Sequence, residues 1–121
     1  MQGTHRPPSV ATVDLLTIRR AARHLVRPDD GPEALPPSAA ELDQLMLQIP
    51  AHLGVLMSEV QRLAERFGED SILGYGALVT VDGARKRLDV DPGPELLQRV
   101  VHARRLARSL QLLARYYEVL S

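Results

Sequence analysis

The chain contains no cysteine and no tryptophan, and its 121 residues include one phenylalanine and three tyrosines. Without cysteine, disulfides, thiol catalysis and cysteine-ligated zinc are excluded. So few aromatic rings also argue against stacking on single-stranded nucleic acid. Basic and acidic side chains number 15 each, so the net charge attracts neither nucleic acid nor a membrane surface. Each of these absences removes a class of protein.

Long apolar runs and an export signal are also missing. The first residues, MQGTHRPPSVA, lack the apolar stretch of a secretory signal peptide. The most apolar run, residues 72–81, is interrupted by Gly74 and Gly76 and is about half as long as a membrane span. We therefore expect a cytoplasmic protein that has no contact with membranes.

The sequence does contain a strong helical periodicity. Between residues 42 and 67 the apolar side chains recur at alternating intervals of four and three, which places them in one stripe about 90° wide. The stripe consists of Leu42, Met46, Ile49, Leu53, Leu56, Val60, Leu63 and Phe67. Ser38 and Glu41 form a capping-box signature before it, and Gly68 suits the helix end. Pro50 predicts a kink within one helix, because the apolar phase continues across it.

Two further segments, 10–26 and 94–120, show the same periodicity, with Pro94 suited to a first helical position. The expected core stripe of the last helix is Leu96, Val100, Ala103, Ala107, Leu110, Ala114 and Tyr117. Residues 71–90 fit a helix with small residues on one side, or a β-hairpin with a turn at Asp82 and Gly83. We prefer the helix, because residues 84–88 have high helix propensity.

These segments predict an all-α fold, a four-helix up-down bundle with a long kinked second helix and a long C-terminal helix. We expect residues 1–9 to form a flexible N-terminal arm and residues 10–121 to form a single helical-bundle domain.

Charge is segregated along the chain. Residues 1–27 carry five arginines against one aspartate, and residues 92–121 carry five arginines against two glutamates. Residues 28–60 carry six acidic side chains and no basic one. We expect this pattern to reflect the packing of oppositely charged helices against one another.

A second apolar strip lies on the last helix, on the side away from its core stripe. It consists of Leu97, Val101, Leu112, Tyr116 and Val119, and it lies beside a cluster formed by Arg104, Arg108 and Arg115. Such a strip is typical of an interface with another protein or with a second copy in a homodimer. The alternatives are scattered exposed apolar residues, a central position of the last helix in which neighbouring helices cover the strip, and an ordinary solvated arginine face.

A polar pocket is a second candidate site, because His52, Glu59 and His102 flank the core stripes of two helices. No nucleophile, phosphate loop or metal-ligand spacing accompanies them, so we expect no catalytic residue, metal or cofactor. Nucleic acid binding is disfavoured, although a regulator using Arg20, Arg23, Arg27 or the arginines of the last helix stays open.

Several short runs resemble a family of small actinobacterial proteins that are often labelled natural-product biosynthesis proteins. They are AHL at 51–53, SEV at 58–60, GARKRL at 83–88, HARRLAR at 102–108 and YYE at 116–118. The resemblance implies a link to secondary metabolism and brings no activity or site residues with it.

The favoured interpretation is a non-catalytic helical accessory or regulatory protein that acts by binding another protein. A small-molecule-binding bundle or enzyme in natural-product biosynthesis and a DNA-binding regulator are the alternatives.

Overall fold

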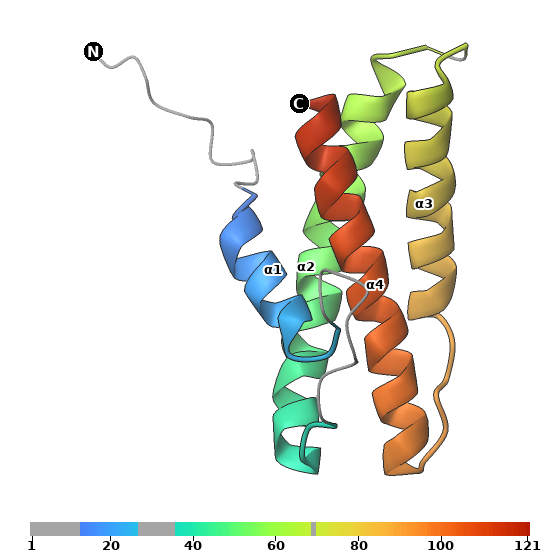
Figure 1. Ribbon diagram of the computed structural model, residues 1–121. Helices are drawn as coiled ribbons and strands as arrows, with labels where there is room; N and C mark the ends of the chain where they lie inside the picture. The colour runs from blue at the N-terminus through green and yellow to red at the C-terminus, as the bar shows by residue number, and fades with distance from the viewer. Residues whose placement is uncertain (1–12, 27–35, 69) are drawn as a thin grey trace.

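The computed structural model describes residues 13–26, 36–68 and 70–121, and in these ranges the chain forms helices and no strand. The helices are α1 (Leu15–Arg23), α2 (Ala39–Glu65), α3 (Ile72–Leu88) and α4 (Leu96–Leu120). They alternate in direction and form an up-down bundle (Figure 1). The predicted all-α bundle with a long second and a long C-terminal helix is confirmed, and the hairpin alternative for residues 71–90 is wrong.

The start of α2 is fixed by the predicted capping box. The Glu41 amide donates to the Ser38 hydroxyl at 3.2 Å, and the Ser38 amide donates to the Glu41 carboxylate at 2.9 Å. The helix then runs through Pro50 without interruption, as expected from the unbroken apolar phase. The kink at Pro50 stays a prediction. After the helix, Gly68 adopts the left-handed conformation with φ 81°.

Two helix starts differ from the prediction. α1 begins at Leu15 and not near Val10, because the Asp14 side chain accepts a hydrogen bond from the Thr17 amide at 3.1 Å and caps the helix there. The expected flexible arm, residues 1–9, lies outside the described residues. α4 begins two residues after Pro94, where the Glu95 amide donates to the Gln98 side chain at 3.1 Å.

The bundle is flattened, with α2 and α4 as its central pair. α1 and α3 each contact both central helices but not each other, and they lie on opposite sides of the pair (Figure 1). As a result, none of the four described helices packs on the outward sides of α1 and α3 or on one side of α4.

The core lies mainly between α2 and α4. Its largest fully buried side chains include Leu53, Leu56, Leu106 and Leu110. The third helix contributes small residues, namely Gly74, Ala77, Val81 and Ala84, and these are buried as expected. A Cβ atom on Gly74 would lie 3.1 Å from the Ala64 carbonyl oxygen, so the missing side chain lets α3 approach α2 closely.

Two residues of the predicted core stripes are exposed instead. Phe67 is 45% exposed because it follows the end of α2, and Leu96 is 44% exposed because it is the first residue of α4. Both therefore lie at the ends of the bundle, where neighbouring helices cover them only in part.

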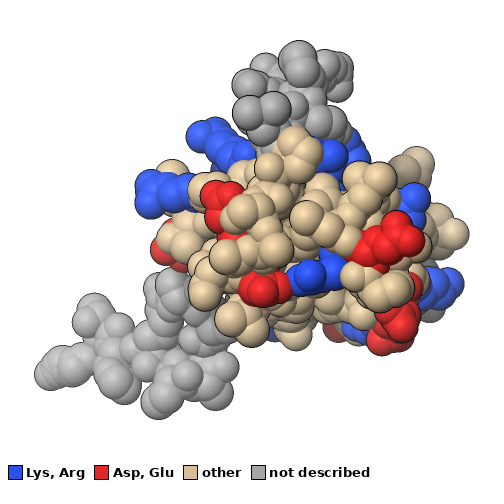
Figure 2. Space-filling view, turned by 90° about the horizontal axis from the view of Figure 1, so that it is seen from below, with Lys and Arg blue, Asp and Glu red and all other residues tan. Residues whose placement is uncertain are grey.

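Charges of both signs are interspersed on the end of the bundle at which α2 and α4 begin (Figure 2). There, Arg99 of α4 forms an ion pair with Asp43 of α2. This contact agrees with the predicted pairing of oppositely charged helices. That prediction is incomplete, however, because the two arginine-rich helices α1 and α4 also pack against each other. None of the described helices combines the length and apolar content that a membrane crossing requires.

Candidate functional site

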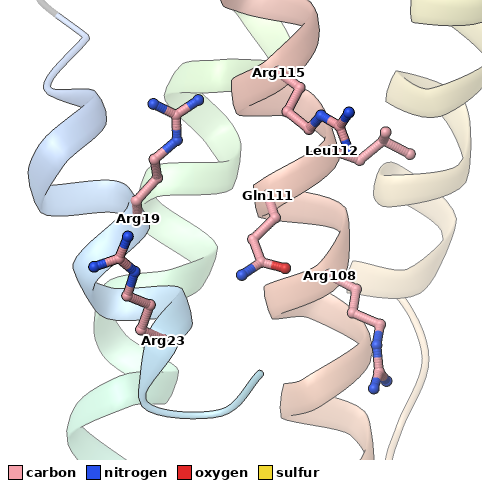
Figure 3. A pocket seen from close by; sticks show the side chains of 6 residues that line it. All are labelled: Arg19, Arg23, Arg108, Gln111, Leu112 and Arg115. Carbon is pink, nitrogen blue, oxygen red and sulfur yellow. The ribbon is translucent and has the colours of Figure 1, made fainter. Parts of the chain in front are cut away.

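An arginine-lined groove of about 200 Å³ lies between α1 and α4 (Figure 3). We call it the arginine groove, and its lining residues are Arg19, Arg23, Arg108, Gln111, Leu112 and Arg115. Four of these six side chains are guanidinium groups and none is acidic. The groove is therefore suited to a ligand that carries carboxylate or phosphate groups, which arginine binds in a bidentate manner.

Helical spacing explains how two helices supply four arginines to one groove. Arg19 and Arg23 are four residues apart on α1, so they lie on the same side of that helix. Arg108 and Arg115 are seven residues apart on α4, with Gln111 and Leu112 between them on the same side. Because α1 and α4 run side by side, both helices contribute to the lining; in Figure 3 Gln111 points toward α1, whereas the guanidinium groups of Arg108 and Arg115 extend away from α1.

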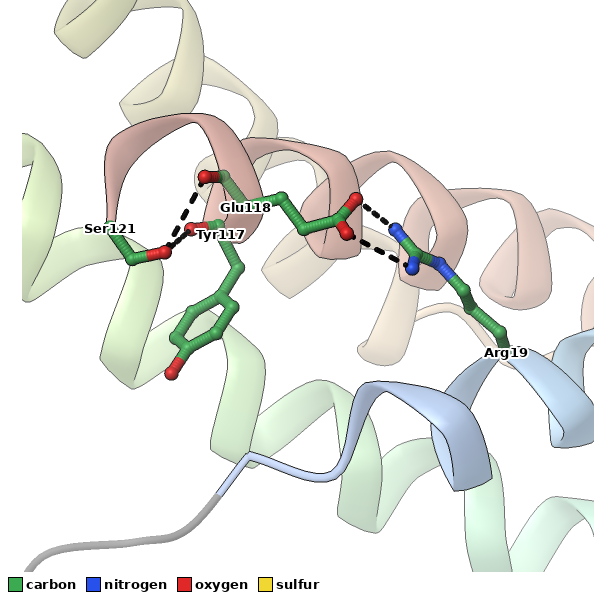
Figure 4. Close-up of polar contacts among 4 residues, drawn as sticks. All are labelled: Arg19, Tyr117, Glu118 and Ser121. Carbon is green, nitrogen blue, oxygen red and sulfur yellow. Dashed lines mark hydrogen bonds and ion pairs between the residues drawn. The ribbon is translucent and has the colours of Figure 1, made fainter.

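The groove is closed at one end by an ion pair between α1 and α4. The guanidinium of Arg19 donates to both carboxylate oxygens of Glu118 (Figure 4). These hydrogen bonds raise the pKa of Arg19 and lower the pKa of Glu118. Arg115 lowers the pKa of Glu118 further through its charge. The Glu118 carboxylate thus offsets part of the positive charge that Arg19 and Arg115 bring to the groove.

Arg104 has a structural role that the sequence did not predict. Its Nε donates to the Leu25 carbonyl oxygen at 3.3 Å, in the turn that follows α1. This oxygen lies beyond the last helical residue, Arg23, so it belongs to the turn and not to the hydrogen bonds of the helix. Arg104 is therefore half-buried and fastens α1 to α4, in contrast to the fully exposed position expected for it.

The predicted apolar strip of α4 is largely exposed. Leu97, Val101, Leu112 and Val119 are all solvent-accessible, and Arg108 and Arg115 lie on the same side of the helix. We call these six residues the α4 outer face. Its apolar and basic side chains alternate, and it shares Arg108, Leu112 and Arg115 with the arginine groove.

Tyr116 does not belong to this face, although the sequence predicted it there. It is half-buried against α3, where a Cβ atom on Gly76 would lie 2.7 Å from the Tyr116 hydroxyl oxygen. Gly76 therefore makes room for the tyrosine, which helps to pack α3 against α4.

The residues of the second predicted site, a polar pocket, lie in different surroundings. His102 is buried and lines a groove with the α3–α4 connection, including Asp91, and with Arg105. Burial lowers the pKa of His102 first of all, the charge of Arg105 lowers it further, and Asp91 opposes both. Neither of the grooves around His102 includes His52 or Glu59. A pocket shared by all three residues stays a prediction.

Glu59 instead forms an ion pair with Arg62 on its own helix, at 3.0 Å. Within the described ranges no three His, Asp or Glu side chains are grouped so that they could hold a metal ion.

Sequence reasoning missed the contribution of α1 to the groove. Arg19 had no assigned role, and Arg23 was considered only for DNA binding. The available signal was the excess of arginine in both residues 1–27 and residues 92–121. Only the packing of α1 on α4 shows that the two basic segments form one site.

No curated protein and no solved structure matches the chain significantly. One family model, described as a family of unknown function (DUF6415), matches residues 16–121 and so covers α2, α3 and α4 and all of α1 except Leu15. The chain therefore belongs to the DUF6415 family of unknown function.

Proposed function

We propose that this protein is a non-catalytic accessory or regulatory protein that binds an acidic, amphipathic segment of another protein. The binding surface is the α4 outer face together with the arginine groove. The observation that carries this proposal is that apolar residues and arginines alternate along the same exposed side of α4.

The length of this surface favours a protein segment over a small molecule. Leu97 and Val119 are separated by about 33 Å along the helix at 1.5 Å per residue. An amphipathic helix bound lengthwise could cover this distance, with apolar side chains on Leu112 and Val101 and carboxylates on Arg108 and Arg115. Arginine and carboxylate form bidentate pairs, which add orientation to the apolar contact.

The charge of the α4 outer face favours a different protein over a second copy. In an antiparallel two-fold dimer centred near Leu112, Arg108 of one copy would lie near Arg115 of the other and the reverse. Like charges placed opposite each other in an interface cost binding energy, so an acidic partner is the better match.

The biological setting is also part of the proposal. Support for a role beside natural-product biosynthesis comes from the runs at 51–53, 83–88 and 102–108 and the resemblance they carry. A cytoplasmic location is the expectation that goes with such a role.

Binding of designed helical peptides tests the proposal. One peptide carries leucine on one side and glutamate on the flanking positions, and its control replaces every glutamate with lysine. Isothermal titration calorimetry should detect binding of the glutamate peptide and no binding of the lysine peptide. A matched pair of protein variants locates the site. Arg108→Glu with Arg115→Glu should abolish binding, whereas Arg66→Glu with Arg85→Glu, also exposed, should not.

Three results would contradict the proposal. The first is equal binding of both peptides, and the second is binding that survives the change of Arg108 and Arg115. The third is preferential, salt-sensitive binding of a DNA duplex over the glutamate peptide, which would favour the DNA-binding alternative.

A further inference from the structure

The third helix exposes large apolar side chains on the side that faces away from the bundle. Ile72 is 89% exposed, Tyr75 is 67% exposed and Val79 is 53% exposed. They are spaced by three and four residues and therefore lie in one line on α3. Asp82 and Lys86 continue this line toward the end of the helix. We call these five residues the α3 outer face.

The inner side of the same helix is apolar as well. Its buried residues are Gly74, Ala77, Val81 and Ala84, so the first half of α3 is apolar on both sides, whereas the last turns carry exposed charged residues. A helical segment that is apolar on both sides is normally covered on both sides. In the described part of the chain, α2 and α4 cover only the inner side.

We propose that the α3 outer face is a self-association site, at which two copies of the chain pack their α3 helices antiparallel around a two-fold axis near Val79. This interface is separate from the partner-binding surface proposed for α4. The two surfaces lie on different helices and share no residue.

Charge argues for a second copy as the occupant. Lys86 and Asp82 form an ion pair with an N–O distance of 3.0 Å, so the α3 outer face has no net charge. Two such faces can therefore approach without repulsion, whereas two α4 outer faces would bring arginines together. A self-complementary surface is the requirement for a two-fold interface.

The antiparallel arrangement also fixes which residues of the two copies face each other. With the axis at Val79, helical numbering places Tyr75 of one copy opposite Gly83 of the other, and Ile72 opposite Lys86. The Arg87 guanidinium lies over Gly83, with its Nη1 atom 3.4 Å from where a Cβ atom would be, so the tyrosine ring would meet this guanidinium, a favourable cation–π arrangement. The methylene groups of a lysine can cover an isoleucine while the ammonium group stays in water.

The expected affinity follows from the size of the contact. α3 has 17 residues and a length of about 25 Å. A single helix pair of this length falls below the roughly 800 Å² per partner that standard stable interfaces bury. We therefore expect a reversible dimer with a micromolar dissociation constant.

Sedimentation equilibrium of the full chain tests the proposal. Over a range of about 1 to 500 µM, the apparent mass should rise from 13.4 kDa toward twice that value. Val79→Asp should raise the dissociation constant by at least about 100-fold, because each dimer would bury two carboxylates at its centre. Leu112→Asp, an equally exposed apolar position on α4, should leave the dimer intact.

The absence of cysteine allows a direct test of the register. Val79→Cys should form a disulfide between two copies on mild oxidation, because residues at the two-fold axis lie closest together. Leu112→Cys should not. Circular dichroism should show unchanged helicity for every variant, since both positions are exposed.

The proposal is overturned if the unmodified chain stays at 13.4 kDa over the whole range, or if Val79→Asp dimerises as well as the unmodified chain. Dissociation by Leu112→Asp would overturn it too, because the interface would then lie on α4. Val79→Asp should still bind the glutamate peptide, so a failure of one proposal is distinguishable from a failure of the other.

Discussion

The outward sides of α3 and α4 are both apolar, but they differ in charge. On α3, the apolar residues Ile72 and Val79 are followed by an ion pair that leaves the surface neutral. On α4, Leu112 and Val119 alternate with arginines. A large exposed apolar area is typical of a surface that binds a partner, and this applies equally to both helices. The charge pattern distinguishes the two, because it favours a second copy on α3 and an acidic partner on α4.

The largest expected effect tests whether the outward side of α4 is separable from the core. Leu53→Ala, which empties a fully buried position on α2, should lower the free energy of unfolding by about 2–5 kcal/mol. Leu112→Ala, the same substitution on the α4 outer face, should change it by less than about 0.5 kcal/mol. Urea denaturation of both variants measures the difference. Equal losses would show that Leu112 is part of the core and would remove the basis for a binding face on α4.

Salt should sharpen the comparison between the two surfaces. Raising the NaCl concentration from about 50 to about 500 mM should weaken binding of the glutamate peptide by roughly tenfold, because its contacts with Arg108 and Arg115 are exposed to solvent. Self-association through α3 is apolar at its centre and should change by less than about twofold over the same range. Titration calorimetry and sedimentation measure the two constants. If the dimer dissociates at high salt, its interface contains arginines and therefore lies on α4 and not on α3.

The two arginines Arg104 and Arg115 should differ in their effects on stability. Arg104→Ala removes the hydrogen bond to the Leu25 carbonyl oxygen and should lower the free energy of unfolding by about 1 kcal/mol. Arg115→Ala, at an exposed position, should change it by less than about 0.5 kcal/mol. Thermal and urea unfolding can compare the variants side by side. If Arg104→Ala costs no more than Arg115→Ala, the contact does not hold α1 in place.

The smallest effect concerns His102, which lies in the groove at the connection between α3 and α4. Burial lowers the pKa of His102 in the folded protein. At pH values below about 6.5 the unfolded chain therefore binds more protons at this residue than the folded protein does. The free energy of unfolding should therefore decrease between about pH 7 and pH 5, and His102→Gln should lack this component. Urea midpoints over this range give both curves, and parallel curves would show that His102 titrates alike in both states. The carboxylates with lowered pKa values, such as Glu118, affect the free energy of unfolding only at lower pH.

Much of the fold follows from local signals in the sequence. The stripe from Leu42 to Leu63 and the capping box at Ser38 located α2, because both depend only on neighbouring residues. The start of α1 was misplaced because the local cap formed by Asp14 and Thr17 outweighs an apolar periodicity that extends further toward the N-terminus. Periodicity alone also cannot tell that Leu96 lies at the end of the bundle.

The candidate sites were less predictable, because they depend on which helices become neighbours. The exposure of Leu112 and Val119 could be predicted from α4 alone, since its core stripe lies on the opposite side. The arginine groove required the packing of Arg19 and Arg23 against residues about 90 positions later in the chain. The exposed apolar side of α3 was not predicted, although its buried side was, because a periodic stripe locates the buried side and does not show whether another helix covers the opposite one.

The shortness of α1 couples the groove to the stability of one segment. A helix of nine residues does not persist alone in water, so α1 keeps its shape only while it is docked on α2 and α4. Half of the arginines in the groove therefore belong to a segment that local unfolding would release first. A ligand that bridges Arg23 and Arg108 would bind the docked state alone and shift the equilibrium toward it. Binding in the groove and docking of α1 are thus coupled. Because of this coupling, slower amide hydrogen exchange in α1 would report that the groove is occupied.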